Sequence, residues 1–321
     1  MLAGEKRGSI PVLGKNKAFL PFGDQPLVGL VVAALDRAET IGSITVVGPC
    51  DRLTAELGRL KTVKPIRLLE QGRNIFDNII QGALSTFAEY RPGMGLADFR
   101  SLPAADKDKA AVMLTSDMPL IDPREVDHFL STAPLDRADI IYGWTSHETL
   151  APYEPAEGKP GIKFIYGCTS RHLMRHSNIA IYRPLRIAPV MEEFVQIIYS
   201  LRYQRYLTNV VKALIQLLRQ ASHPKYSYLF LLLEGASFCH NHGFLRLRDL
   251  IRQRIELPWA EAIISDLFQT RFATHQTIGP GLTLDVDDED SYRVFLARIE
   301  EWKEIQKKQI ETALQGEKPG Q

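Results

Sequence analysis

The sequence predicts an α/β protein built on a mixed, mostly parallel sheet with a helical insertion. Between residues 17 and 146, short segments of strand character alternate with helical segments of about 10–15 residues, which is the pattern of a doubly wound sheet. From residue 189 to residue 254 the pattern is instead helical almost throughout. Hydrophobic residues make up 45% of the 321 residues, enough for a large core, so a globally disordered chain is excluded.

The first half contains five predicted strands with helices between them. Strands are expected at 17–22, 43–48, 66–69, 110–114 and 138–144, and helices at 26–39, at 75–90 and from 123 onward. Asn74 and Asp122 are typical N-cap residues, and each is followed by an acidic residue at the third helical position. Residues 91–109 combine Pro, Gly and mixed charge, and predict a loop. Ligands of such sheets bind beyond the carboxyl ends of the strands, so residues that directly follow a strand are the candidates for function.

The second half combines further strands with the helical region. Strands are expected at 162–166, 178–182 and 282–286, and a closing polar helix at 290–314. We therefore expect a core over 1–188, a helical insertion or subdomain over 189–256, a return to the core over 257–314 and a frayed tail over 315–321.

Charge and cysteine content exclude several classes of protein. The chain has 39 Lys and Arg against 38 Asp and Glu, a net charge of +1, which does not favour a nucleic-acid partner. Three widely spaced cysteines form neither a disulfide framework nor a four-cysteine zinc site, and they fit a reducing cytoplasm. Neither a signal peptide nor a run long enough to span a membrane is present, so we expect a soluble cytoplasmic protein. The oligomeric state is not indicated by the sequence.

One segment at the start of the chain has the chemistry of a phosphate site. Glycine in Leu2-Ala3-Gly4 lets backbone N–H groups approach phosphate oxygens, and Lys6 and Arg7 would neutralise them. The segment matches neither a P-loop nor a dinucleotide-binding fingerprint. Taken alone, it is equally well explained as a basic N-terminal segment without a ligand.

Five segments in one order give these residues a more specific meaning. LAG near residue 2 and KAFLPFGDQPLV from Lys17 are followed by QGRN at 71–74, TSDMPLI at 115–121 and DVDDED at 285–290. This order resembles the MobA-like NTP transferase family, which includes molybdenum-cofactor guanylyltransferases and sugar-phosphate and methylerythritol-phosphate cytidylyltransferases. The resemblance implies a Rossmann-like three-layer fold of the nucleotide-diphospho-sugar transferase type. It also implies Mg²⁺-dependent transfer of a nucleoside monophosphate from an NTP to a phosphorylated small-molecule acceptor, with release of pyrophosphate.

The resemblance assigns roles residue by residue. It implies that Lys17 and Arg7 contact the phosphates as catalytic groups, and that Asp117 and Asp287 bind Mg²⁺, with Asp285 as an alternative to Asp287. The nucleotide would be held by Leu2, Ala3, Gly4, Gln71, Gly72 and Asn74. The acceptor would lie near Asn178 and His176, which follow the basic residues of a loop around His172.

Departures from the family pattern keep rival interpretations open. Glu5 stands in place of the second Gly of the first loop, Ser116 in place of the Gly before the metal Asp, and Asp288-Glu289 in place of Thr-Pro. These differences favour a catalytically degenerate nucleotide- or sugar-nucleotide-binding protein. A GT-A-like glycosyltransferase with a D-x-D site is a second rival. Each acidic segment alone is also typical of a turn cap or a solvated loop, although Asp290 at the sixth position excludes an EF-hand.

Two further segments have a simple structural explanation. His240 and His242 adjoin Cys239, but a second cluster at zinc-finger spacing is absent, so a packed cysteine beside a turn is favoured over a metal. Residues 199–206 mix aromatic and basic side chains. A packed helix with outward-reaching arginines is favoured there over a peripheral membrane contact.

Overall fold

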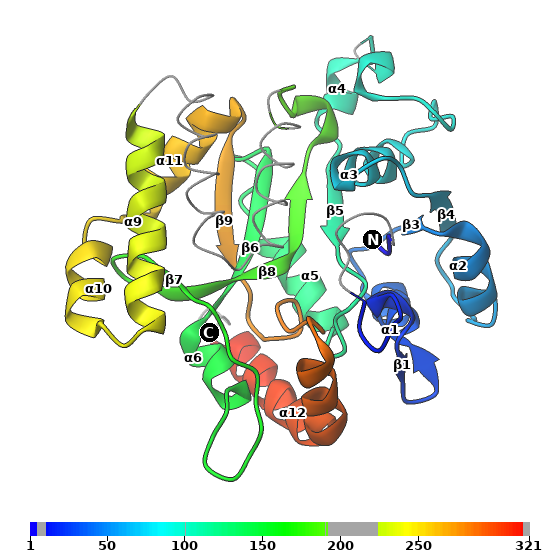
Figure 1. The fold of residues 1–321 in the computed structure, drawn as a ribbon. Helices are drawn as coiled ribbons and strands as arrows, with labels where there is room; N and C mark the ends of the chain where they lie inside the picture. The colour runs from blue at the N-terminus through cyan, green and yellow to red at the C-terminus, as the bar shows by residue number, and fades with distance from the viewer. Residues whose placement is uncertain (5–10, 100, 190, 192–223, 317–321) are drawn as a thin grey trace.

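The computed structural model describes residues 1–4, 11–99, 101–189, 191 and 224–316 (Figure 1). Its strands are β1 (Pro21–Phe22), β2 (Gln25–Pro26), β3 (Ile44–Gly48), β4 (Ile66–Glu70), β5 (Ala111–Leu114), β6 (Ile140–Ser146), β7 (Gly167–Cys168), β8 (Leu173–Tyr182) and β9 (Phe272–Gln276). Its α-helices are α1 (Leu27–Arg37), α2 (Cys50–Leu57), α3 (Ile75–Leu84), α4 (Ala104–Lys107), α5 (Pro123–Thr132), α6 (His147–Leu150), α9 (Pro224–Asn241), α10 (Leu245–Arg252), α11 (Leu257–Phe268) and α12 (Glu289–Gly316). Short 3₁₀ helices lie at Lys17–Phe19, Leu96–Phe99, Ala151–Tyr153 and Pro184–Arg186.

The central sheet is mixed and mostly parallel, as predicted. β3 pairs with β4 in parallel, and β6 pairs with β9 in parallel, whereas β8 runs antiparallel to both of its neighbours, β5 and β6. Leu2 joins the two halves, because it forms parallel bridges to Val47 and Thr115. The N–H of Leu2 donates to the carbonyl of Leu114 at 2.9 Å, and that of Ala3 donates to Val47 at 2.8 Å. The order across the sheet is therefore β4, β3, residues 1–3, β5, β8, β6 and β9.

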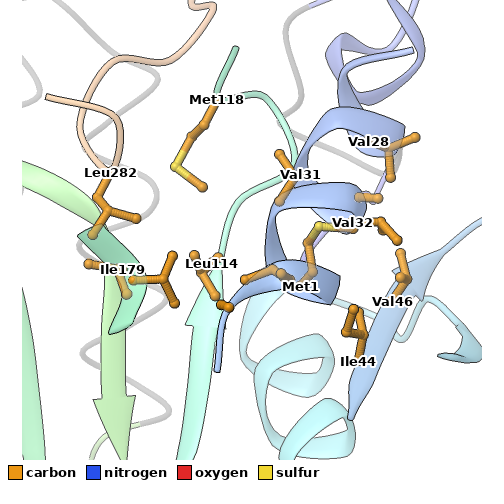
Figure 2. Close-up of a cluster of buried hydrophobic side chains, with 14 of the residues drawn as sticks. Met1, Val28, Val31, Val32, Ile44, Val46, Leu114, Met118, Ile179 and Leu282 are labelled. Carbon is orange, nitrogen blue, oxygen red and sulfur yellow. The ribbon is translucent and has the colours of Figure 1, made fainter. Parts of the chain in front are cut away.

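Helices cover both faces of this sheet, which gives the expected three layers. On one face, Val31 of α1 and Val126 of α5 belong to the buried cluster that contains Ile141 of β6. Figure 2 shows the part of this cluster in which α1 meets β3, β5 and β8. On the other face, Phe76 of α3 packs in the cluster that contains Ile140 of β6. Side chains of adjacent strand residues point to opposite faces, so Ile140 and Ile141 supply the two cores.

Most of the predicted strands are confirmed, but residues 17–22 are only partly a strand. Lys17–Phe19 form a 3₁₀ turn, and only Pro21–Phe22 pair, as β1 with β2. The side chain of Asn16 accepts a hydrogen bond from the Ala18 N–H and so caps this turn. A polar side chain that satisfies the backbone locally competes with strand pairing, which explains the difference.

The strand predicted at 282–286 is wrong. Thr283 and Leu284 both donate to the carbonyl of Pro280, so this segment begins as a turn, and it continues without regular strand pairing. It is nevertheless buried, because the side chains of Leu282, Leu284 and Val286 fill the core. The chain instead returns to the sheet one segment earlier, as β9, which the sequence pattern did not indicate. Residues 162–166, also predicted as a strand, are extended without pairing.

The helical region of the second half is described only in part. α9, α10 and α11 lie together at one side of the sheet, where α10 and α11 both contact α9 (Figure 1). The aromatic and basic stretch at 199–206 lies outside the described residues. In the described parts of the chain, every helix falls short of the length and apolar character needed to cross a membrane. The closing helix predicted at 290–314 is confirmed as α12.

Candidate functional site

The predicted site residues follow strands whose carboxyl ends lie at one edge of the sheet. β3 ends at Gly48, β4 at Glu70 and β5 at Leu114, and residues 2–4 run parallel between β3 and β5. Because β8 is antiparallel, its first residues lie at the same edge, where Arg175 pairs with Thr145 near the end of β6. The topology therefore brings residues 2–4, the segment after β4 and the start of β8 to one edge of the sheet.

Two glycines at this edge are closely surrounded. A Cβ atom on Gly4 would lie 3.2 Å from Gln71 Oε1 and 3.3 Å from Asn78 Nδ2. A Cβ atom on Gly72 would lie only 2.7 Å from the Cβ of Asp77. The Gly72 N–H donates to Asn78 Oδ1 at 2.6 Å, so Asn78 holds the loop after β4. The predicted nucleotide residues Gly4, Gln71 and Gly72 are thus brought together, and Asn78, which sequence reasoning missed, joins them.

Asn16 links the first loop to the turn that carries Lys17. Its Nδ2 lies 3.3 Å from the carbonyl of Ala3 and 3.1 Å from that of Gly4, while its Oδ1 accepts from the Ala18 N–H. One side chain therefore fixes the distance between the two predicted phosphate-contacting segments. The signal in the sequence is an N-cap residue directly before Lys17, but its reach to residue 3 depends on the fold.

The start of α3 also points to this edge. Asn74 accepts a hydrogen bond from the Asp77 N–H at 2.8 Å, which confirms it as the N-cap. Arg73 Nε lies 2.8 Å from Asp77 Oδ2, an exposed pair in the first turn. A helix N-terminus carries partial positive charge and unpaired N–H groups, which favour an anion.

Charged side chains from three distant segments meet beside these loops. Lys17 Nζ lies 3.3 Å from Asp287 Oδ1. Arg175 Nη2 lies 3.4 Å from Asp285 Oδ1 and 3.5 Å from Asp287 Oδ2. Asp287 therefore has a cation at each of its two oxygens. Sequence reasoning named Lys17, Asp285 and Asp287, whereas Arg175 was noted only as part of a basic loop.

Asp117 lies next to this cluster. Its carbonyl accepts from the Val286 N–H at 3.0 Å, so the segment after β5 runs beside the residues that carry Asp285 and Asp287. Carboxylate oxygens suit Mg²⁺, which typically takes one or two protein carboxylates and completes its shell with phosphates and water. Among the described residues, three or more His, Cys, Asp or Glu side chains are nowhere grouped closely enough to hold a metal. Among the described residues, this edge therefore offers individual carboxylates and no complete protein cage for a metal.

The two predicted acceptor residues lie in different surroundings. Asn178 is buried, and its Nδ2 is 3.4 Å from the carbonyl of Thr283, so it holds the segment that leads to Asp285. His176 is exposed and lies edge-on to the Tyr142 ring, with ring centroids 5.5 Å apart. Arg7 lies outside the described residues.

A buried carboxyl group contacts the segment that precedes Asp285. Glu125 of α5 is 1% exposed and accepts from Gln306 Nε2 at 2.7 Å and from the Gly281 N–H at 3.1 Å. Burial raises the pKa of Glu125 from 4.5 to about 7, since a low-dielectric environment disfavours the charged form. The sequence identified Glu125 only as the third residue of a helix.

Comparison with solved structures identified chains with a similar fold. A hypothetical transferase from Thermus thermophilus superposes with a TM-score of 0.58 at 18% identity, over 90% of this chain and 96% of that one. CMP:2-keto-3-deoxy-manno-octonic acid synthetase complexed with CTP gives a TM-score of 0.44 at 12% identity, over 94% and 97% of the two chains. For 4-diphosphocytidyl-2C-methyl-D-erythritol synthase from Anaerococcus prevotii DSM 20548 the TM-score is 0.43 at 7% identity, over 93% of each chain. The first similarity supports the fold, and the other two are too distant to carry an argument.

Sequence comparison is more specific. A comparison with curated protein sequences gave no match. The profile of the MobA-like NTP transferase domain, however, matches residues 8–222, which is more than half of the chain. The chain therefore belongs to the MobA-like NTP transferase family of nucleotidyltransferases.

Proposed function

We propose that this protein transfers a nucleoside monophosphate from an NTP to a phosphorylated small molecule and releases pyrophosphate. The observation that carries the proposal is a cluster of two cations and two carboxylates. Lys17 lies 3.3 Å from Asp287, and Arg175 lies within 3.5 Å of both Asp285 and Asp287. Asn16, next to Lys17, is hydrogen-bonded to the loop that contains Gly4. Cations for a triphosphate and carboxylates for its metal are the two components that phosphoryl-group chemistry needs, because the reaction depends on positioning and charge neutralisation.

The chain's own residues would bind and orient the reactants. An oxygen of the acceptor phosphate forms a bond to the α-phosphorus in line with the α–β bridging oxygen, whose bond to the α-phosphorus breaks as pyrophosphate leaves. Lys17 would stabilise the charge that builds on the α-phosphate, and Arg7 would hold the β- and γ-phosphates. Leu2, Ala3 and Gly4 would contact the nucleotide, and Gln71, Gly72 and Asn74 would line the base pocket.

Asp117 and Asp287 are the proposed ligands of Mg²⁺. When bound, the metal would neutralise part of the triphosphate charge. The proximity of Asp117 to the segment 285–287, through the hydrogen bond from Val286, supports this pair. For the acceptor, Asn178 and His176 remain the proposed neighbours. Because Cys50, Cys168 and Cys239 are all free thiols, we also propose that the protein works in the cytoplasm.

A pyrophosphate-release assay tests this function. Each of the four NTPs would be supplied with Mg²⁺ and a pooled set of phosphorylated acceptors, and wild type would be compared with Asp117→Ala. Asp136→Ala, which removes an exposed carboxylate from the loop before β6, is the matched control. We expect acceptor-dependent pyrophosphate from one NTP, lost in Asp117→Ala and retained in Asp136→Ala.

Other outcomes would identify a rival function. Thermal stabilisation by one Mg·NTP without turnover would favour a nucleotide-binding protein, the role that the substitutions Glu5 and Ser116 in the family pattern suggest. Release of a nucleoside diphosphate from a nucleotide-sugar would favour a glycosyltransferase. Absence of both nucleotide binding and turnover would contradict the proposal.

A further inference from the structure

Arg175 occupies a position between two carboxylates of the candidate site. Its Nη2 lies 3.4 Å from Asp285 Oδ1 and 3.5 Å from Asp287 Oδ2, and Lys17 Nζ lies 3.3 Å from the other oxygen of Asp287. Oxygens of two acidic side chains thus converge on one guanidinium nitrogen. Such convergence of carboxylate oxygens on one positive centre is the arrangement that a divalent cation would otherwise take.

The fold holds this arginine in place. The side chain of Arg175 is 18% exposed, and that of Asp285 is 6% exposed. The guanidinium carbon lies 5.1 Å from the centroid of the Phe164 ring, and the backbone of Arg175 is paired with Thr145 inside the sheet. The contact of Arg175 with Asp285 and the Phe164 ring is therefore largely buried, whereas the side chain of Asp287 is 46% exposed.

The same geometry disfavours the binding of a metal ion without a nucleotide. Two cations lie within 3.5 Å of the carboxylates, so a divalent ion that entered alone would meet their repulsion at short range. In the described parts of the chain, groups of three or more metal-ligating side chains are also absent. A triphosphate would remove both obstacles, because its oxygens supply further ligands and give Arg175 and Lys17 new anionic partners.

We propose that Arg175, held between Asp285 and Asp287, occupies part of the space that a divalent cation bound by Asp117 and Asp287 would take, so that the metal enters this site only together with a nucleotide. Arg175 is then a positioning residue: it keeps the two carboxylates oriented before the substrate arrives and turns to the phosphates once the metal is present. This inference rests on the proposed function for the identity of the site. It adds an order of assembly and a selectivity for the metal–nucleotide complex over the free metal.

Binding of Mn²⁺ alone, measured by the electron paramagnetic resonance signal of the free ion, tests the proposal without any turnover. Arg175→Gln removes the cation, Arg175→Lys keeps its charge, and Arg37→Gln removes the same charge from the exposed end of α1 as a control. We expect Arg175→Gln to bind bare Mn²⁺ at least about tenfold more tightly than wild type, because the repulsion is removed. Arg175→Lys and Arg37→Gln should stay within about threefold of wild type.

Addition of the NTPs without acceptor gives the second measurement. After subtraction of the Mn²⁺ that the same NTP concentration binds without protein, wild type should bind Mn²⁺ at least about tenfold more tightly with the preferred NTP than without it, and Arg175→Gln should lose most of this difference. Circular dichroism of each variant checks that it is folded. If Arg175→Gln does not fold, Arg175→Met, which also removes the charge but keeps an apolar side chain against the Phe164 ring, replaces it and should show the same gain in affinity for bare Mn²⁺.

The outcomes separate this proposal from the proposed function. Equal affinity of wild type for Mn²⁺ with and without a bound NTP would overturn the role of Arg175, and so would an unchanged bare-Mn²⁺ affinity in folded Arg175→Gln. Failure of every NTP to bind would overturn the nucleotidyltransferase function. In that case a tighter bare-metal site in Arg175→Gln would still support the placeholder role of the arginine.

Discussion

Lys17 and Asp287 are separated by 270 positions in the sequence, and their Nζ and Oδ1 atoms lie 3.3 Å apart. Lys17 opens a 3₁₀ turn near the start of the chain, and Asp287 ends the buried segment that leads into α12. The site is therefore assembled from the two ends of the chain around the edge of the sheet. The site therefore depends on segments that are not strands. Substitutions in these segments test their contributions to turnover and stability.

Replacement of Lys17 should affect turnover far more than stability. Lys17→Met removes the cation proposed to stabilise charge at the α-phosphate, and we expect kcat to fall about 100-fold. Lys15→Met removes an exposed lysine two residues earlier and should leave kcat unchanged. Steady-state pyrophosphate release with the preferred NTP measures both. A Lys17→Met enzyme as active as Lys15→Met would exclude Lys17 from the chemistry.

Gly72 should not tolerate a side chain. The new Cβ atom of Gly72→Ala would lie 2.7 Å from the Cβ of Asp77, so the loop or the start of α3 must shift. We expect a loss of about 1–3 kcal/mol in the free energy of unfolding, together with weaker nucleotide binding. Gly42→Ala meets open space and should change stability by less than about 0.5 kcal/mol. Urea denaturation measures both, and similar losses in the two variants would contradict the packing argument.

Glu125 should make stability fall as the pH rises through the weakly acidic range. Its pKa is about 7 in the folded protein and near 4.5 in the unfolded chain, so the folded state retains a proton that the unfolded state releases. The stabilisation is complete below about pH 4.5 and is lost by about pH 7, at up to roughly 1.4 kcal/mol per pH unit.

Glu125→Gln keeps the shape of the side chain and removes the titration. Denaturant unfolding between pH 5 and pH 8 should therefore show a flatter pH dependence for Glu125→Gln than for wild type. Because Glu125 is buried next to Gln306 and the Gly281 N–H, a difference between the two pH profiles reports on this one carboxyl group. Parallel pH profiles for the two proteins would show that Glu125 ionises equally in the folded and unfolded states.

A group of buried hydroxyls should hold the segment that carries Asp285. Thr283 Oγ1 lies 2.7 Å from Ser177 Oγ, and both it and Thr277 are bonded to Thr145 Oγ1. Thr283→Val leaves partner hydroxyls unsatisfied and should lower the free energy of unfolding by about 1–3 kcal/mol. Thr54→Val, at an exposed position on α2, is the control and should lie within about 0.5 kcal/mol of wild type. Thermal unfolding of both variants decides whether the hydroxyl network is structural.

The sequence predicted those parts of the fold in which a local pattern and the final environment agree. Residues 43–48 became β3, because an apolar, β-branched run of that length has few other ways to be buried, whereas 66–69 became β4, whose side chains are at most half-buried. β9 was missed, since FATHQ has neither a clear alternation nor flanking turn residues and is a strand only through its pairing with β6. Residues 282–286 were predicted as a strand because a buried segment without regular strand pairing can have the same apolar composition as a paired strand.

The candidate site shows a similar division. Motif order placed Gly4, Lys17 and Asp287 in one site before the fold was known, and the structure brings Lys17 and Asp287 into contact. Asn16 and Arg175 could not be assigned in this way, because neither belongs to one of the five segments and their contacts depend on the fold. Their importance is a property of the strand order, and above all of the antiparallel direction of β8.

The position of residues 1–3 has a consequence for the order of folding during synthesis. Leu2 lies between β3 and β5, both of which leave the ribosome after it. At about 5–20 residues per second, β5 follows Leu2 by roughly 5–20 s. β3 is synthesised earlier in that interval, but until β5 emerges the centre of the future sheet lacks at least one neighbour, so its unpaired backbone must stay solvated or be protected by other factors. Substitutions that slow translation upstream of β5 would lengthen this exposure without altering the folded protein.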